Sequence, residues 1–150
     1  MTFSIRRFGA WATPGTVKRR SGGGWVGVTS IRRRSGGTWV TVWSAFSATA
    51  SPSTLFGTTK VNGARAQTSS PSTVTVSGGS GTVAYSWEFV SGDTVITPNT
   101  PASASTYFGG KVGVLNPDRS AVYRCRVTNG DGSVTYTNNV SISLAYVSGT

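Results

Sequence analysis

The feature that most constrains the fold is an internal repeat of 14 residues near the amino terminus. Residues 17–30 and 31–44 align without a gap, and residues 5–11 form a weaker copy. Both full copies place Ser-Gly-Gly between a basic segment and a segment that begins with Trp-Val one residue later. Glycine adopts the positive φ that a tight turn requires, and β-branched or aromatic residues flank it. Each copy of this building unit therefore predicts a β-hairpin.

Alternation of side chains along each hairpin predicts two distinct faces. Successive residues of a strand point to opposite sides. In the last copy we expect Trp39, Thr41 and Trp43 on one face. Val40 and Val42 then lie on the other face, and the preceding copy follows the same pattern.

The predicted hairpins bury little surface when they stand alone. Two-stranded ribbons are marginally stable in water, and their open edges invite another chain to pair. We therefore interpret residues 1–46 as an anchoring and assembly region that docks on a partner or on other copies of the chain. A closed ring would cover the edges, so we expect a homo-oligomer, with a trimer favoured. The candidate partner-binding residues are its tryptophans and the basic runs of the full copies: Trp11, Lys18, Arg19, Arg20, Trp25, Arg32, Arg33, Arg34, Trp39 and Trp43.

Positive charge is concentrated in the same region. The chain has 14 basic and 4 acidic residues, and residues 1–50 hold eight of the basic residues and no acid. Three interpretations are open: a solvated strand face, contact with an acidic protein surface, and single-stranded nucleic acid, for which interleaved basic and aromatic residues are typical. We favour the first two, because the repeat sets the spacing and the rest of the chain is nearly neutral.

The rest of the chain predicts a linker and a sandwich. Residues 47–56 are small and polar, which indicates a linker, with Leu55 and Phe56 entering the next domain. Residues 57–150 hold short β-branched and aromatic segments between Gly-, Asn- and Asp-containing turns, a pattern typical of an all-β sandwich. The expected strands are Lys60–Ala66, Thr73–Ser77, Thr82–Val90, Val95–Ile96, Thr106–Val112, Ala121–Thr128 and Ser133–Leu144.

Two motifs of this region, Tyr85-Ser-Trp87 and Tyr123-Arg-Cys125, resemble those of an immunoglobulin-like sandwich. Such sandwiches carry a buried Trp on the third strand and Tyr-x-Cys on the sixth. The resemblance implies that Trp87, Tyr123 and Cys125 are structural core residues. It also implies that Tyr123 forms the tyrosine corner ahead of the sixth strand.

Cys125 departs from the antibody pattern because it is the only cysteine of the chain. An internal disulfide is therefore impossible. Val74 or Val76 stands where the partner cysteine of an antibody domain would lie. We interpret Cys125 as a small buried apolar residue that packs on Trp87.

The repeats and the later motifs together resemble small virion proteins of tailed bacteriophages, of the minor tail, fibre or capsid decoration type. The residues that carry this resemblance are the Arg-Arg-Ser-Gly-Gly-x-Trp-Val repeats, the segment 78–93 and Tyr-Arg-Cys at 123–125. The resemblance implies a structural component of a virion, assembled in the host cytoplasm. Residues 1–46 would anchor it to capsid, tail or fibre proteins, and the Ig-like domain would face outward for weak adhesion to host surfaces.

Residues able to carry catalysis are scarce, so we predict no enzyme, no cofactor and no metal. There is no His, the commonest general base and metal ligand. Glu88 and Asp93 flank a turn and are the only candidate carboxylate pair. Asp131 alone is too little for a calcium site, which usually collects several carboxylates. No apolar run approaches the ~18 residues of a membrane span, so no membrane insertion is expected.

Two alternative functions remain open. The basic front region would suit a nucleic-acid-binding accessory protein, whose binding should fall steeply with salt. The sandwich would suit a carbohydrate-binding adhesion module that uses Tyr107 and Phe108.

Overall fold

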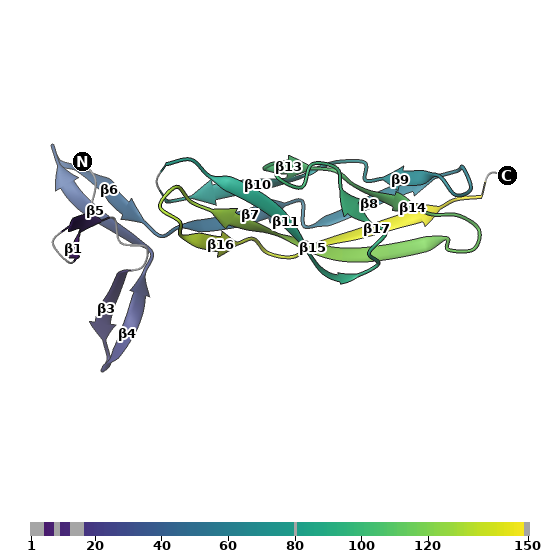
Figure 1. Ribbon diagram of the computed structural model, residues 1–150. Coiled ribbons are helices and arrows are strands. Elements are labelled where there is room, and N and C mark those ends of the chain that lie inside the picture. Colours follow the sequence, from purple (N-terminus) through teal and green to yellow (C-terminus); the bar gives the residue numbers. More distant parts are fainter. Residues whose placement is uncertain (1–4, 8–9, 13–16, 80, 149–150) are drawn as a thin grey trace.

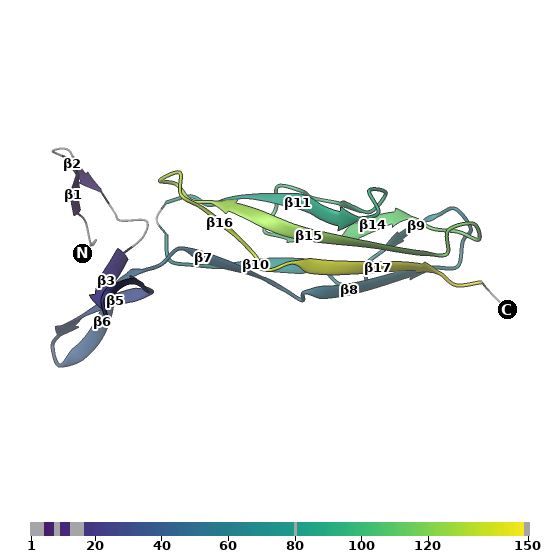
Figure 2. The same cartoon turned by 90° about the horizontal axis from the view of Figure 1, so that it is seen from below.

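The computed structural model describes residues 5–7, 10–12, 17–79 and 81–148. All regular elements in these residues are β-strands, which confirms the predicted all-β class. Figures 1 and 2 show small two-stranded hairpins at one end of an elongated, two-layered sandwich. The last strand ends at the opposite end of the sandwich (Figure 1).

The described amino-terminal residues form three separate antiparallel hairpins. Their strands are β1 (Ile5–Arg7) with β2 (Ala10–Ala12), β3 (Val17–Ser21) with β4 (Gly24–Val28), and β5 (Ser30–Ser35) with β6 (Thr38–Ser44). The turns of the two full copies are Gly22-Gly23 and Gly36-Gly37, with φ of 57° and 83° in the first and 56° and 83° in the second. Positive φ at both central residues defines a type I′ turn, whose twist matches that of the flanking strands.

A β-bulge in the β5–β6 hairpin overturns one expectation about its faces. The register pairs Ile31 with Trp43 and Arg32 with Thr41, so Val42 has no partner. An extra residue on one strand shifts the side chains beyond it to the other face. Trp43 therefore shares a face with Val40, and not with Trp39 as strict alternation predicted.

The first layer of the sandwich holds four strand positions. Two of them are interrupted strands: β9 (Arg65–Gln67) continues into β10 (Ser72–Ser77), and β13 (Ser105–Thr106) continues into β14 (Phe108–Lys111). β10 pairs with β13 and with β7 (Ser47–Ser51), while β14 pairs with β9 and with β12 (Thr97–Pro98). The order across this layer is therefore β7, β9–β10, β13–β14, β12, with every pair antiparallel.

The second layer has the order β11, β15, β17, β8, and β16 also pairs with β15. Antiparallel pairs join the first three, while β8 pairs with β17 in parallel. Because β7 belongs to one layer and β8 to the other, the chain crosses between layers just after Ser51. The strands are β8 (Thr54–Thr59), β11 (Ala84–Gly92), β15 (Asp118–Thr128), β16 (Val134–Tyr136) and β17 (Val140–Tyr146).

The core lies between the two layers and follows from strict alternation along the strands. In β15 every second residue from Ala121 to Val127 is buried, and β17 repeats the pattern from Val140 to Leu144. Burying one face of each sheet against the other is the main source of stability in such a sandwich.

An aromatic cluster joins the layers at the centre of this core. The ring of Phe108, from the first layer, lies edge-on to Trp87 at 5.4 Å between centroids and 5.1 Å from Tyr123. Trp87 stands directly opposite Cys125 in the β11–β15 pair, and all four residues are buried. The indole Nε1 of Trp87 donates to the carbonyl of Ser103 at 3.0 Å, so its polar atom is satisfied.

Tyr123 does not form the expected tyrosine corner. Its hydroxyl donates to the carbonyl of Ile96 at 2.6 Å, in the connection between β11 and β12. A tyrosine corner would bond the backbone a few residues upstream. That backbone is already strand here, because β15 pairs with β17 from Asp118 onward.

The predicted linker at 47–56 is wrong. These residues form β7 and the start of β8, and Ala48, Ala50 and Leu55 are buried in the core while Phe56 is exposed. Ala and Ser carry little hydrophobic signal, so the sequence of this segment does not reveal that every second residue of β7 is buried.

Several expected strands also have different bounds. Residues 60–64 form a turn with Gly63 at φ 73°, so that strand begins only at Arg65. Residues 95–96 lie in a turn ahead of β12. The long final strand is interrupted after Tyr136, where the Thr137 hydroxyl accepts a hydrogen bond from the amide of Cys125 at 2.9 Å.

Candidate interaction surface on the hairpin repeat

The cross-strand register brings basic and aromatic side chains together on one face of each full hairpin. Arg20 stands directly opposite Trp25, and Arg34 directly opposite Trp39. Directly opposed residues project to the same side of a sheet, as do residues two apart on one strand. We call the resulting surfaces the Trp faces: Lys18, Arg20 and Trp25 in the β3–β4 hairpin, and Arg32, Arg34 and Trp39 in the β5–β6 hairpin.

The Arg–Trp pair recurs at the same place in the weaker copy. There Arg6 is opposite Trp11 in the β1–β2 hairpin. The three pairs are spaced by the 14-residue period. In both full copies the Arg–Trp pair comes directly after the pair of residues that flanks the turn. The Trp11 side chain itself lies outside the described residues.

The Trp faces are open to solvent. Trp25 is 71% exposed and Trp39 is 64% exposed, and the four cations beside them are exposed as well. Within the described residues, the salt bridges join Arg119 to Asp93 and Arg124 to Glu88, so none involves the hairpins. Large exposed indoles beside unpaired cations are unusual on a surface that contacts only water.

The opposite faces of the hairpins are apolar with a single cation each. The β3–β4 hairpin places Arg19 with Val26, and the β5–β6 hairpin places Arg33 with Val40. Both valines are 45% exposed. Arg19 and Arg33, which were predicted to bind partners together with the other basic residues, therefore point away from the Trp faces.

Trp43 has a different role from the other tryptophans. It is only 7% exposed and lies at the base of the β5–β6 hairpin, opposite Ile31. Its prediction as a partner contact does not fit this burial. The bulge at Val42 turns it inward, so it packs within the chain.

The hairpins are joined to the sandwich by close backbone packing. On the hairpin side of this joint, the amide of Ala45 donates to the carbonyl of Thr29 at 2.8 Å, which closes the base of the β5–β6 hairpin. Gly78, at φ 72°, lies so near that an added Cβ would be 2.4 Å from the Ala45 carbonyl oxygen. A Cβ on Gly79 would lie 2.9 Å from the ring of Phe46. The joint therefore depends on two glycines.

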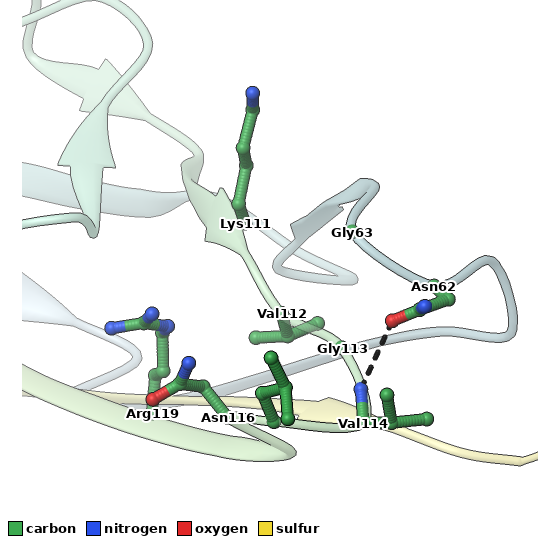
Figure 3. A pocket seen from close by; sticks show the side chains of 9 residues that line it. Asn62, Gly63, Lys111, Val112, Gly113, Val114, Asn116 and Arg119 are labelled. Carbon is green, nitrogen blue, oxygen red and sulfur yellow. Dashed lines mark hydrogen bonds between the residues drawn. The ribbon is translucent and has the colours of Figure 1, made fainter.

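A second candidate surface lies at the end of the sandwich opposite the hairpins. It is a hollow of about 240 Å³ between the loops around Asn62 and Val114 (Figure 3). Asn62 accepts the amide hydrogen of Val114 at 3.0 Å, while the Lys111 side chain extends away from the hollow. Leu115 is 90% exposed beside it. The hollow is smaller than most small-molecule sites, which measure about 300–1,000 Å³.

The candidate carboxylate pair does not exist as a unit. Glu88 lies 3.6 Å from Arg124, and Asp93 is paired with Arg119. The Val95 amide and Arg119 lower the pKa of Asp93 by hydrogen bonding to its charged form. Each carboxylate therefore has a structural partner of its own.

Other predicted chemistry is also accounted for by packing. The Ser133 hydroxyl and amide both donate to Asp131, which lowers the pKa of that carboxyl. Burial raises the pKa of the Cys125 thiol.

Phe108 is fully buried and cannot contact a glycan, whereas Tyr107 is 38% exposed. No three metal-type ligands gather anywhere in the described part of the chain. The same residues include no helix long and apolar enough to cross a membrane.

The comparison with known proteins adds no relative. No protein-family model matches the chain, and no curated protein matches it significantly.

Proposed function

We propose that the chain is a non-enzymatic structural protein of a virion. Residues 1–46 anchor it to a capsid, tail or fibre protein, and the sandwich is displayed outward as an Ig-like module. The observation that carries the proposal is the pair of solvent-exposed Trp faces, which project from one end of a sandwich that has its own core.

The strand order supports an Ig-like interpretation of the sandwich. Ig-like constant domains place the first, second, fifth and fourth strands in one sheet and the third, sixth and seventh in the other. With β9–β10, β13–β14 and β16–β17 each counted as one strand, the two layers follow this order. β8 adds a parallel strand beside the last one.

The virion assignment is supported by the motifs that resemble small phage virion proteins and by the shape of the molecule. The hairpins lie at one end, and the β8–β9 and β14–β15 connections lie at the other (Figure 1). These connections carry the exposed residues Val61, Val114 and Leu115. An anchor at one end leaves the opposite end free for weak contacts with a host surface. Assembly as a homo-oligomer remains part of the proposal because the outer edges of β4 and β6 are open.

The test is incorporation into particles. The phage that encodes the chain would be complemented with the wild-type protein or with Trp25→Ser/Trp39→Ser, and purified particles would be probed for the protein. We expect the wild type in the particles and at least a ten-fold loss for the variant. Tyr107→Ser, on an exposed sandwich residue, is the control. Equal incorporation of all three proteins, or their absence from particles, would contradict the anchor.

A nucleic-acid-binding role is the second candidate, since unpaired cations flank both exposed tryptophans. Bases stack on such rings. Binding to a single-stranded oligonucleotide should then weaken steeply between 50 and 200 mM salt, because phosphate contacts release counterions. Retention that is absent at low salt or insensitive to salt rules the role out.

A further inference from the structure

Each full hairpin leaves both of its strand edges open. Among the described strands, β3 pairs only with β4, and β5 pairs only with β6. An open edge presents a row of backbone N–H and C=O groups that another polypeptide strand can bind. The hairpins therefore offer a ladder that a further strand can continue.

The open edge and the Trp face belong to the same residues. In a two-residue hairpin the pair that flanks the turn is hydrogen-bonded, and bonded pairs then alternate along the ladder. Ser21 pairs with Gly24 at the turn, so the backbone groups of Lys18 and Arg20 point outward. In β5 the alternation starts from the Ser35–Thr38 pair, so the backbone groups of Arg32 and Arg34 point outward as well.

The positive charge of these edges favours an acidic partner. Residues 17–44 hold six basic side chains and no acid. A strand added beside β3 would place its alternate side chains next to Lys18 and Arg20, where carboxylates pair and cations repel.

A second copy of the chain cannot supply these carboxylates. The sequence has only 4 acids against 14 basic residues. Asp93 and Glu88 are held by Arg119 and Arg124, and Asp131 is bound within its own turn by Ser133. Asp118 is exposed outside these salt bridges, but one carboxylate cannot pair with the two cations on each of the two Trp faces. The partner is therefore a different molecule.

We propose that an extended acidic segment of a partner protein adds as a strand to the outer edges of β3 and β5. Its alternate Glu or Asp side chains pair with the Lys18–Arg20 and Arg32–Arg34 cations on the Trp faces, and its backbone continues the ladder. This inference rests on the proposed anchoring function and names the chemistry of the anchor's partner. A polypeptide fits better than a nucleic acid because a polypeptide strand both donates to and accepts from the backbone groups of the edge, whereas phosphate oxygens only accept.

The test uses the full chain and three probes. The first is a ten-residue peptide of alternating Glu and Thr, and the second is the same peptide with every backbone amide N-methylated, which keeps the charge and removes all backbone donors. The third is an oligothymidylate of equal charge. We expect the Glu-Thr peptide to bind at least about ten-fold more tightly than either of the others at 150 mM salt, measured by isothermal titration calorimetry.

The chain offers matched variants of equal charge. Arg20→Ala/Arg34→Ala removes cations from the Trp faces, while Arg19→Ala/Arg33→Ala removes the same charge from the opposite faces. We expect the first pair to weaken peptide binding at least about ten-fold and the second less than about three-fold. Amide chemical shifts of β3 to β6 establish that each variant keeps its hairpins.

Hydrogen exchange of the backbone amides distinguishes strand addition from attraction between charged side chains. Bound peptide should slow exchange of the Lys18, Arg20, Arg32 and Arg34 amides, because a new strand would accept their hydrogen bonds. Unchanged exchange at these amides, equal weakening by both variants, or tighter binding of either other probe overturns the proposal. So does self-association that buries the Trp faces without peptide. If Trp25→Ser/Trp39→Ser still blocks particle incorporation in any of these cases, the anchoring function stands and only the acidic strand is refuted.

Discussion

Trp87 is the residue on which the two layers of the sandwich most depend. It is 5% exposed, it packs edge-on against Phe108, and its indole nitrogen is bonded to Ser103. Removing it would leave a cavity, an unsatisfied carbonyl and a thiol without its neighbour. Neither motif spacing nor alternation could predict the Ser103 contact, because that residue lies in an irregular connection.

We therefore predict that Trp87→Ala lowers the free energy of unfolding of the sandwich by about 3–5 kcal/mol. Urea denaturation followed by circular dichroism measures this difference. Trp25→Ala is the matched control, since Trp25 is 71% exposed and its loss should change the same free energy by less than about 0.5 kcal/mol. Similar effects for both variants would contradict the central role of Trp87.

Asp93 makes the stability of the sandwich depend on pH. Hydrogen bonds from the Val95 amide and Arg119 lower its pKa in the folded state. A carboxyl with a lowered folded pKa contributes stability above its unfolded pKa of about 3.9, and this contribution is lost as the pH falls through the folded pKa.

Asp93→Asn should accordingly cost about 1 kcal/mol or less at pH 7, as expected for a partly exposed ion pair. The difference from wild type should shrink as the pH falls below about 4, where the carboxyl of the unfolded state takes up a proton, and it should vanish below the lowered folded pKa, where the wild-type carboxyl is protonated in both states. Urea denaturation at a series of pH values measures it. Asp118→Asn, which removes an exposed carboxylate outside the described salt bridges, is the control. A difference independent of pH would show that Asp93 acts only through packing.

At the scale of single elements, the hairpins follow local rules and the sandwich strands do not. The turns at 22–23 and 36–37 follow from Gly-Gly alone, because no other residue adopts two successive positive φ angles so readily. Gly27 and Gly57 show the contrast within strands. A Cβ on Gly27 meets nothing within 4 Å, whereas one on Gly57 would lie 2.2 Å from the Gln67 carbonyl oxygen.

The two glycines should respond oppositely to the same substitution. Gly27→Thr, which copies Thr41 of the next repeat, should stabilise the β3–β4 hairpin by up to about 1 kcal/mol. Gly57→Thr should destabilise the sandwich by about 1–3 kcal/mol through overpacking against β9. Amide exchange reports the hairpin, and urea denaturation reports the sandwich. Toleration of Gly57→Thr would contradict the close approach of β8 and β9.

At the scale of the whole molecule, the chain combines a well-packed body with appendages that bury little. The described hairpins are two-stranded, and the basic residues of the β3–β4 and β5–β6 hairpins are exposed. Regions with few buried contacts open at low free-energy cost. The sandwich, in contrast, encloses a continuous core from Ala48 to Leu144.

Limited digestion with trypsin should therefore cut first at residues 18–20 and 32–34. The stable product should begin at Ser35 and contain the intact sandwich, identified by mass spectrometry. Arg119, Arg124 and Arg126 lie in β15, an interior strand of its layer, and each is paired with a neighbouring strand, so they should resist cleavage. An initial cut within β15 would contradict the division between hairpins and sandwich.

The sequence by itself determined what depends on neighbouring residues. The 14-residue period, the Gly-Gly turns and the alternation of the strands are local, so the all-β class and the hairpins could be predicted. The burial of Trp87 and Cys125 followed from a known motif. Even the Arg–Trp pairs follow from the repeat once a two-residue turn sets the register, although face alternation alone did not reveal them.

Only the tertiary structure decided what depends on contacts between distant segments. The bulge that turns Trp43 inward, the crossing of residues 47–56 between layers and the Asp93–Arg119 pair leave no periodic trace in the sequence. Each is selected because the two layers must close over one core and satisfy its polar groups. That requirement acts on the folded chain as a whole, so no local pattern encodes it.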